Sequence, residues 1–568
     1  MRRLLPFVLL AVAACGAPEN QPSVSFTVRL SEAAVNEMDA LGLETPVHGR
    51  VFVIISRSEE REPRLQTGVS GVPFWSIPVE GLAGGSAVEV SAASEGLLGF
   101  PMDHPGELPP GEYFAQALVS AYTTFNRADG HTVSMHLNAG EGQNQWRAPG
   151  NAHSSPVRFS VPETGRTRLE LTVNTVIQPD HPVPAGGSLQ QGNPPDTDWV
   201  KYPKIRSALL SEFWGHDIWI GANVLLPAGY ESSSKSYPVV YLQGHFPGDG
   251  APFGFDPEGQ SRGARTEGFS EWWASGDAPP VIAVSIRDAN PYYDTSYSVD
   301  SDNLGPYGRA ITEELIPHLE SQFRMVPAEW ARVVAGGSTG GWEAIAMQVF
   351  YPDYFGGSWG WCPDPVDFNY YQIVNVYEDE NAYYTDSEWH RVERPNARSF
   401  DGNVRSTVRQ ENRLEYATGP GSRSGGQWAI WEAVFGPVGD DGYPRPIWDP
   451  VTGAIDRQTA EFWRANYDIH QHLRANWETL AGKLDGKLHI AVGDMDSYYL
   501  DNAVYLLDEF LRNTQPRIEA DIEYGRRKPH CWIGYSPSGS GEDLTYREFI
   551  EEAAAHMLAN APRGFDAP

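Results

Sequence analysis

The sequence predicts a chain of two parts: a β-sandwich, and an α/β domain whose mostly parallel sheet carries helices on both faces. Three observations support this. With 568 residues the chain exceeds what one core usually holds. Its first part alternates apolar and polar residues at the two-residue period of half-buried strands. Its second part alternates apolar strands with helical segments, which is typical of a parallel sheet.

The β-sandwich is expected over residues 16–177. Strand patterns occur at Ser25–Leu30, Val51–Ile55 and Glu112–Val119, with proline and glycine between them. No catalytic constellation is visible in this part. A binding or positioning module and a structural spacer therefore both remain open as its role.

Residues 178–204 are rich in proline, glycine and polar side chains, which predicts a linker. The α/β domain is expected over residues 205–568, and an aromatic-rich segment at about 364–480 interrupts it. That segment leaves the sheet at the carboxyl edge, where α/β sheets place their ligands, so we interpret it as a lid. The strands of the sheet are expected at Ile218–Leu226, Pro238–Leu242, Val281–Ile286, Arg332–Ala335, Leu488–Val492 and Ile518–Ile522.

The chain begins like an export signal. Residues 1–15 contain a charged start and an apolar run too short to span a bilayer. The run ends in Val12-Ala13-Ala14-Cys15, which resembles a bacterial lipobox. Cys15 would then carry the lipid, and we expect an exported protein held at a bacterial membrane, facing the periplasm or the cell surface, by that anchor only.

The charge balance excludes some partners. The net charge is −32, from 74 acidic and 42 basic residues. Nucleic acid needs a basic face, so it is not expected as a partner. So acidic a surface also suits a salty habitat. Besides Cys15 only two cysteines remain, too few for a structural zinc cage, and neither a metal nor a cofactor is expected.

Ser338 is the predicted nucleophile. It lies in Gly336-Gly337-Ser338-Thr339-Gly340, between a β-branched strand and a helical segment. A serine at such a turn is pushed clear of the sheet, and glycines two residues to either side let strand and helix approach. The backbone N–H groups that open the helix can hold a developing negative charge. The pattern thus favours a serine hydrolase.

A second Gly-X-Ser-X-Gly match surrounds Ser358. Two prolines follow it, at Pro363 and Pro365, and these forbid the helix that an elbow requires. We therefore assign Ser358 to the next strand of the sheet.

A serine nucleophile needs an imidazole and a carboxylate, which in α/β hydrolases follow the serine in the order acid, then histidine. Asp494 and Asp496 directly follow one strand, and His530 follows the next. Either aspartate could be the acid at this point. The other downstream histidines lie in the lid, in a helical segment or inside a strand, where structural roles are expected: His390, His470, His472 and His489.

The chain resembles the putative-esterase family of α/β hydrolases, which includes enterochelin esterases, S-formylglutathione hydrolase, feruloyl and acetylxylan esterases, and mycolyltransferases. The resemblance covers roughly residues 205–560 and is carried by four segments: Gly336 to Gly341, Tyr297 to Phe323, Gly493 to Tyr499, and Pro529-His530-Cys531-Trp532. It implies Asp496 as the acid. It also implies an oxyanion hole made by the backbone N–H groups of His245 and Thr339.

The expected function is hydrolysis of a small-molecule or carbohydrate-linked carboxylic ester by Ser338, His530 and Asp496. An acyltransferase would use the same triad, and an inactive binding protein could share the scaffold. Finally, Cys362 and Cys531 are both expected at the carboxyl edge of the sheet, within reach of a disulfide. Two buried free thiols are the alternative.

Overall fold

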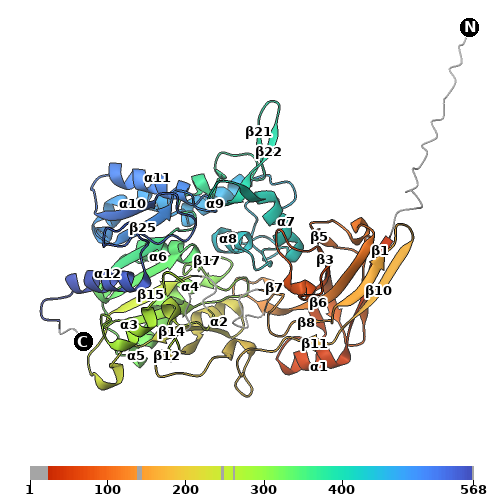
Figure 1. Ribbon diagram of the computed structural model, residues 1–568, viewed down its shortest axis with the longest axis horizontal. Helices are drawn as coiled ribbons and strands as arrows, with labels where there is room; N and C mark the ends of the chain where they lie inside the picture. The colour runs from red at the N-terminus through yellow and green to blue at the C-terminus, as the bar shows by residue number, and fades with distance from the viewer. Residues whose placement is uncertain (1–22, 137–143, 245–247, 260–262, 566–568) are drawn as a thin grey trace, which may run out of the picture.

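The computed structural model describes residues 23–136, 144–244, 248–259 and 263–565. A smaller β-rich domain at the N-terminal end lies beside a larger α/β domain (Figure 1). Among the helices of these residues, none has the length and apolar character needed to cross a bilayer.

The N-terminal domain contains two sheets. In the first, β1 (Ser23–Leu30) runs parallel to β10 (Arg166–Val173) and antiparallel to β4 (Ala87–Val90). The second has the order β11-β8-β6-β2-β3-β5, and β7 and β9 also pair with β6. Apolar side chains of both sheets form one core. The strands of the second sheet are β2 (Val47–Ser56), β3 (Phe74–Leu82), β5 (Leu98–Phe100), β6 (Gly111–Asn126), β7 (Thr132–Met135), β8 (Ala152–His153), β9 (Val157–Val161) and β11 (Thr175–Val176).

Helix α1 (Glu32–Ala40) was not predicted from the strand pattern. It begins after Ser31, whose hydroxyl accepts a hydrogen bond from the backbone N–H of Ala34, and Glu32 occupies its first turn. The helix buries Ala34 and Met38 against the core of the N-terminal domain. The serine cap is the sequence signal that could have revealed it.

The α/β domain is built on a sheet of order β12-β14-β16-β15-β19-β20-β25-β26, with β13 paired to β14. Strand β14 is antiparallel to β16, and the strands from β16 to β26 are mutually parallel. β12 lies inside the predicted linker 178–204, so the sheet begins earlier than expected. The strands are β12 (Val200–Lys201), β13 (Lys204–Ser207), β14 (Ile218–Leu225), β15 (Val239–Gln243), β16 (Ile282–Arg287), β19 (Arg332–Gly337), β20 (Gly357–Trp361), β25 (Leu488–Gly493) and β26 (Ala520–Gly525).

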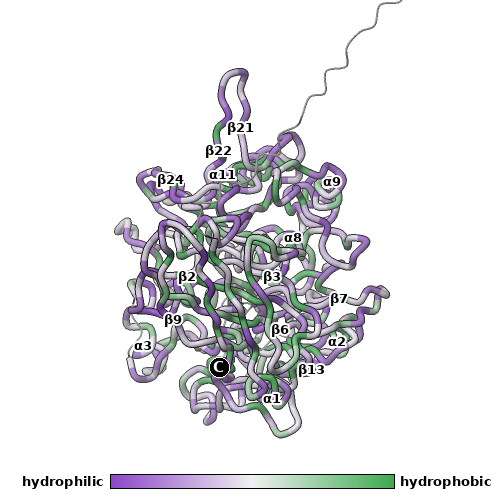
Figure 2. The backbone as a smooth tube through the Cα atoms, turned by 90° about the vertical axis from the view of Figure 1, so that its right-hand side faces the viewer, coloured by the Kyte–Doolittle hydropathy of each residue, from purple (hydrophilic) through white to green (hydrophobic). Residues whose placement is uncertain are grey.

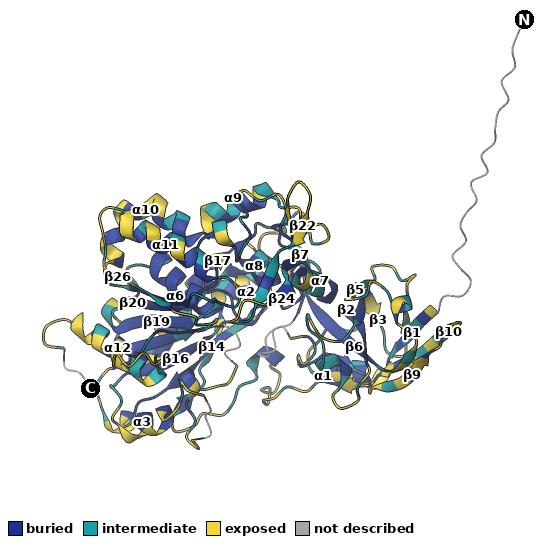
Figure 3. Cartoon of the chain, turned by 45° about the horizontal axis from the view of Figure 1, so that its top comes forward, coloured by how far each residue is buried: buried dark blue, intermediate teal, exposed yellow. Residues whose placement is uncertain are grey.

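Helices cover both faces of this sheet, as the alternating pattern predicts. On one face pack α2 (Ala208–Trp214), α6 (Thr339–Phe350) and α11 (Asp501–Asn513); on the other pack α3 (Phe269–Ser275) and α12 (Tyr546–Ala559). The strands are buried and the outer helix surfaces exposed (Figure 3). Ile311, Leu315 and Leu319, which recur at four-residue spacing, are buried in η6 (Ala310–Leu315) and α5 (Ile316–Gln322), which continue α4 (Tyr307–Arg309).

The segment predicted as a lid, residues 364–480, joins β20 to β25 and is called the insertion below. Most of its aromatic side chains, including Tyr371, Trp431 and Trp448, belong to the same core as the sheet. Trp389 is 80% exposed, in the β21–β22 hairpin that projects from the body of the protein (Figures 1 and 2). The insertion contains η8 (Phe368–Tyr370), β21 (Tyr384–Asp386), β22 (Arg391–Glu393), β23 (Pro395–Arg398), β24 (Val404–Thr407), α7 (Val408–Thr418), α8 (Gln427–Phe435), α9 (Arg457–Asn466) and most of α10 (Ile469–Leu484).

The N-terminal domain packs directly on the insertion. The hydroxyl of Ser76 on β3 donates to the carbonyl of Ala417 at 2.7 Å, and both groups are buried. Arg127, just after β6, donates to the carbonyl of Gly442 at 3.0 Å. Because buried hydrogen bonds are costly to leave unmade, these contacts fix the N-terminal domain against the insertion.

Candidate active site

Ser338 lies at the tight turn between β19 and α6. Its backbone has φ 58° and ψ −118°, a conformation that L-residues rarely adopt. A Cβ atom at Gly336 would overlap the carbonyl of Gly340, and one at Gly340 would overlap the carbonyl of Gln243 on β15. The two glycines therefore let the strand and the helix approach, while the serine hydroxyl points away from the sheet.

The structure brings the three residues predicted for catalysis together. His530 Nε2 lies 2.9 Å from Ser338 Oγ, and His530 Nδ1 lies 2.7 Å from Asp496 Oδ2. The other carboxylate oxygen of Asp496 accepts hydrogen bonds from the backbone N–H groups of Tyr498, at 2.9 Å, and Leu500, at 3.3 Å. The Asp496 side chain is fully buried, so its position is fixed by these bonds.

Asp494, the other acid that the sequence left open, accepts a hydrogen bond from the backbone N–H of Arg527. Its side chain thus ties the loop after β25 to the loop after β26. It has no described contact with His530, and the geometry therefore favours Asp496.

The charge state of His530 is set by two opposed effects. Burial by itself lowers the pKa of the imidazole, but the charge and hydrogen bond of Asp496, together with those of Cys531, outweigh it. The pKa of His530 is held well above its ordinary value of 6.5. An imidazolium at His530 would therefore be stabilised by Asp496.

A second carboxylate, which the sequence analysis did not single out, faces the serine. Asp364 Oδ1 lies 3.4 Å from Ser338 Oγ. Asp364 follows β20 at the carboxyl edge of the sheet and is 3% exposed. Burial raises the pKa of its carboxyl group, while several hydrogen bonds oppose that rise. The only signal in the sequence was its position just after a strand of the parallel sheet.

The side chains assigned to structural roles lie away from the triad. Ser358 is within β20, fully buried, and its hydroxyl donates to the carbonyl of Lys487 at 3.1 Å. His470 Nδ1 lies 2.5 Å from Asp367 Oδ2, and His489 stacks on Trp359. His472 packs edge-on against a phenylalanine of α6, and His390 is exposed in the β21–β22 hairpin.

Thr339, the predicted oxyanion donor that follows the nucleophile, is the first residue of α6. Backbone N–H groups in the first turn of a helix have no partner within the helix, so they can turn toward an oxyanion. The Thr339 hydroxyl lies 3.1 Å from Asp364 Oδ2. The second predicted donor, His245, lies outside the described residues, as does Cys15.

The predicted disulfide between Cys362 and Cys531 is wrong for this structure: both cysteines are free thiols. The topology does bring them together, as expected. The thiols meet through a hydrogen bond that lowers the pKa of Cys531, whereas burial raises the pKa of Cys362. The two sulfurs therefore contact each other through a hydrogen bond and are not joined by a covalent bond.

In the described part of the chain, one group has the composition of a metal site. Ligand atoms of Cys362, His530 and Cys531 lie within 4.8 Å of one another. However, both ring nitrogens of His530 contact triad residues. A metal bound here would occupy a ring nitrogen of His530 that now contacts Ser338 or Asp496. The arrangement therefore suits a proton relay better than a metal.

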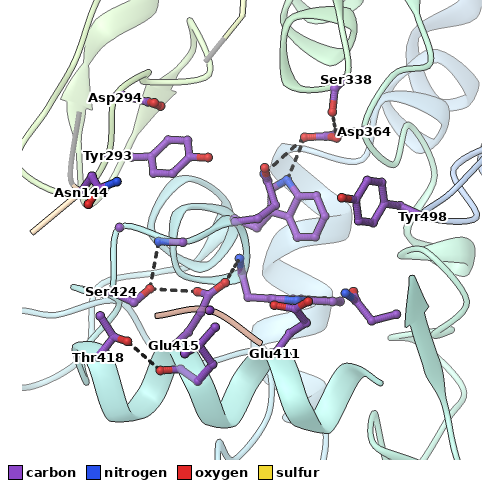
Figure 4. A pocket seen from close by; sticks show the side chains of 18 of the residues that line it. Asn144, Tyr293, Asp294, Ser338, Asp364, Glu411, Glu415, Thr418, Ser424 and Tyr498 are labelled. Carbon is purple, nitrogen blue, oxygen red and sulfur yellow. Dashed lines mark hydrogen bonds between the residues drawn. The ribbon is translucent and has the colours of Figure 1, made fainter. Parts of the chain in front are cut away.

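The triad opens into a cavity of about 640 Å³ (Figure 4). Three parts of the chain line it: the N-terminal domain, the strand ends of the α/β domain, and α7 and α8 of the insertion. Its polar, charged and aromatic lining includes Asn144, Arg147, Tyr293, Asp294, Ser338, Asp364, Glu411, Glu415, Trp428, Trp431, Tyr498 and His530.

The fold and the geometry of the site are typical of an α/β hydrolase that uses a serine nucleophile. Residues 217–408 match the family described as "Putative esterase", which confirms the resemblance seen in the sequence. This match supports a carboxylic-ester hydrolase. The match includes Ser338 and Asp364, whereas Asp496 and His530 lie beyond it.

Among solved structures, the chain is similar to a ferulic acid esterase, with 16% identity, coverage of 58% of this chain and 90% of the other, and a TM-score of 0.34. It is also similar to an S-formylglutathione hydrolase from Agrobacterium tumefaciens, with 14% identity, coverage of 64% and 96%, and a TM-score of 0.31. No curated protein matches the chain.

Proposed function

We propose that the protein cleaves a carboxylic ester through an acyl-enzyme formed on Ser338. The observation that supports this is the chain of contacts from Ser338 Oγ to His530 Nε2, at 2.9 Å, and from His530 Nδ1 to Asp496, at 2.7 Å. Such a chain is what a serine hydroxyl needs to become a nucleophile near neutral pH.

In the proposed reaction, Ser338 Oγ attacks the ester carbonyl as His530 Nε2 accepts its proton. The tetrahedral oxyanion is held by backbone N–H groups, with that of Thr339 as one donor. His530 then protonates the departing alcohol. Water then attacks the acyl carbon and gives a proton to His530, which returns a proton to Ser338 Oγ as the acyl–oxygen bond breaks and the acid leaves. Asp496 keeps the imidazole in the tautomer that both steps require.

We further propose that the insertion acts as a lid and that the N-terminal β-sandwich helps to position the substrate. Trp428 and Trp431 of α8 and Asn144 and Arg147 of the N-terminal domain line the same cavity as Ser338. A small-molecule ester in this cavity would be enclosed on several sides. Enclosure favours chemistry because it excludes water and fixes the acyl group.

The test is hydrolysis of para-nitrophenyl, feruloyl, acetyl-sugar and catecholate esters by the secreted full-length protein. At least one ester should be turned over, and Ser338→Ala should lose that activity. A fluorophosphonate that labels Ser338 would report the nucleophile independently of the choice of ester. If neither hydrolysis nor labelling of Ser338 is detected, the proposed function is wrong.

The cellular location is also a proposal, because it rests on the first residues of the sequence. The lipobox-like Val12-Ala13-Ala14-Cys15 supports an exported lipoprotein anchored through Cys15. Cys15→Ser should move the protein from the membrane fraction to the soluble fraction with unchanged specific activity. Continued membrane association of that variant would overturn the proposal.

A further inference from the structure

The catalytic cavity is acidic. Four carboxyl groups line it, against one guanidinium and the catalytic imidazole. The acidic residues are Asp294, Asp364, Glu411 and Glu415, and the basic ones are Arg147 and His530. Burial raises the pKa of Glu415 to about 7, which is the response of a carboxyl group that lacks a compensating positive charge. The cavity thus favours a ligand that brings a positive charge.

Asp364 is the carboxyl group nearest to the reacting atom, and neutral donors hold it in place. Its Oδ2 accepts hydrogen bonds from the hydroxyl of Tyr297 at 2.6 Å and the indole N–H of Trp431 at 3.2 Å. Thr339, at 3.1 Å, and Gln427, at 3.4 Å, also donate to the same oxygen. With Oδ2 so occupied, Oδ1 is left facing Ser338 Oγ at 3.4 Å (Figure 4).

A negative charge in this position opposes catalysis unless it is neutralised. The attack on an ester carbonyl creates an oxyanion, and two like charges a few ångströms apart in a dry site repel strongly. The donors that hydrogen-bond to Asp364 within the described residues are all uncharged, and His530 acts on it only through space, where it lowers the pKa of the carboxyl group. A substrate cation can supply a positive charge in direct contact with Asp364.

We propose that the acyl group of the substrate carries a protonated amine on the carbon next to the carbonyl, and that Asp364 Oδ1 binds this amine. This inference rests on the proposed function. A reactive carbonyl carbon lies about 3–3.5 Å from the attacking oxygen, so a substituent one carbon further on falls within reach of Asp364 Oδ1. Four aromatic residues also line the cavity, Trp428, Trp431, Tyr293 and Tyr498, and aromatic rings attract cations. The substrate class is therefore the α-aminoacyl esters.

The experiment compares alanyl, lactoyl and propanoyl esters of one alcohol, which differ only in an amine, a hydroxyl or a methyl group at the same carbon. At pH 7 most of the alanyl ester is protonated. A charge-assisted hydrogen bond predicts that kcat/KM for the alanyl ester exceeds that for the propanoyl ester about 10- to 100-fold. Asp364→Asn should lower this ratio by about the same factor, and Asp494→Asn, outside the cavity, should keep it.

The ratio is measured within one variant, so loss of folded protein does not change it. If Asp364→Asn does not fold, binding of alaninamide, lactamide and propanamide to Ser338→Ala by calorimetry supplies the second measurement, with alaninamide expected to bind most tightly. Equal or better use of the propanoyl ester by the wild type would overturn the inference, as would preference for the lactoyl ester, which would indicate a neutral contact. A preserved ratio in Asp364→Asn would do the same. Each of these results would leave the proposed ester hydrolysis intact. Failure to cleave any ester would instead count against the proposed function.

Discussion

The two Gly-X-Ser-X-Gly segments of this chain share a pattern and differ in almost everything else. Ser338 lies between a strand and a helix, with φ 58°, and its hydroxyl contacts His530. Ser358 lies inside the neighbouring strand, where its hydroxyl donates to the carbonyl of Lys487. The two strands pair with each other, so both serines are within one small region of the sheet.

The difference shows that glycines beside a serine indicate only that other atoms pack closely there, and several kinds of neighbour can be the reason. Around Ser338, a Cβ at Gly340 would overlap the carbonyl of Gln243, because strand and helix meet there. Around Ser358, a Cβ at Gly360 would lie 2.6 Å from the side chain of Ile345 on α6, because that helix crosses the strand. Of the two, only the packing of the strand against the helix at Ser338 leaves the serine hydroxyl in contact with an imidazole.

The largest expected effect separates the two serines. Ser338→Ala should lower kcat on any ester substrate by on the order of 10⁶, because the nucleophile is removed. Ser358→Ala should retain most of the activity, since it loses one hydrogen bond in a strand. Steady-state kinetics of both variants measures this, and similar losses in the two would reverse the assignment of the elbow.

The next effect separates the two aspartates in the same way. Asp496→Asn should lower kcat by on the order of 10⁴, because the amide favours the wrong tautomer of His530. Asp494→Asn should cost far less, as its side chain bonds only the backbone of Arg527 among the described contacts. The two kcat values test this, and a larger loss in Asp494→Asn would move the acid.

A stability measurement sharpens the comparison of the glycines. Gly340→Ala should destabilise the α/β domain by about 3 kcal/mol or more, because the methyl group meets a backbone carbonyl that cannot move away. Gly337→Ala should change the free energy of unfolding by less than about 1 kcal/mol, since its nearest neighbour, Cys362 Sγ, would be 3.8 Å away. Urea unfolding of both variants measures the two free energies, and equal losses in the two variants would contradict the prediction.

The smallest effect concerns pH. His530 must be neutral to accept the serine proton, and its pKa lies above the ordinary 6.5. The kcat/KM of the enzyme for an ester should therefore fall about tenfold per pH unit on the acid side, with the midpoint above pH 6.5. Of the two serines, Ser338 is the one that contacts an imidazole. A fluorophosphonate should therefore not label Ser358 at any pH. A midpoint below 6.5 would contradict the stabilising role given to Asp496.

Much of the α/β domain could be predicted because its signals are local. The strand runs that precede Ser338, Asp496 and His530, and the order of those residues along the chain, follow directly from period and position. Ile311, Leu315 and Leu319 are buried, as their four-residue helical spacing indicates. Chemistry that lies at the ends of strands is therefore accessible to sequence reasoning.

What could not be predicted depends on contacts between distant segments. Asp364 takes its position from Tyr297 and Trp431, which are separated from it by 67 residues on either side. Trp146 of the N-terminal domain reaches the cavity only because that domain packs on the insertion. The thiols of Cys362 and Cys531 were correctly placed near each other, yet proximity alone does not decide whether two sulfurs bond.

The distribution of the cavity lining along the chain has a consequence for biosynthesis. Asn144 leaves the ribosome before Ser338 and Asp364, and His530 follows Ser338 by 192 residues. A nascent chain that has already exposed Ser338 therefore lacks its imidazole partner until those residues have been made. Activity that depends on the contact between the two can first arise after His530 has left the ribosome, when both halves of the cavity exist.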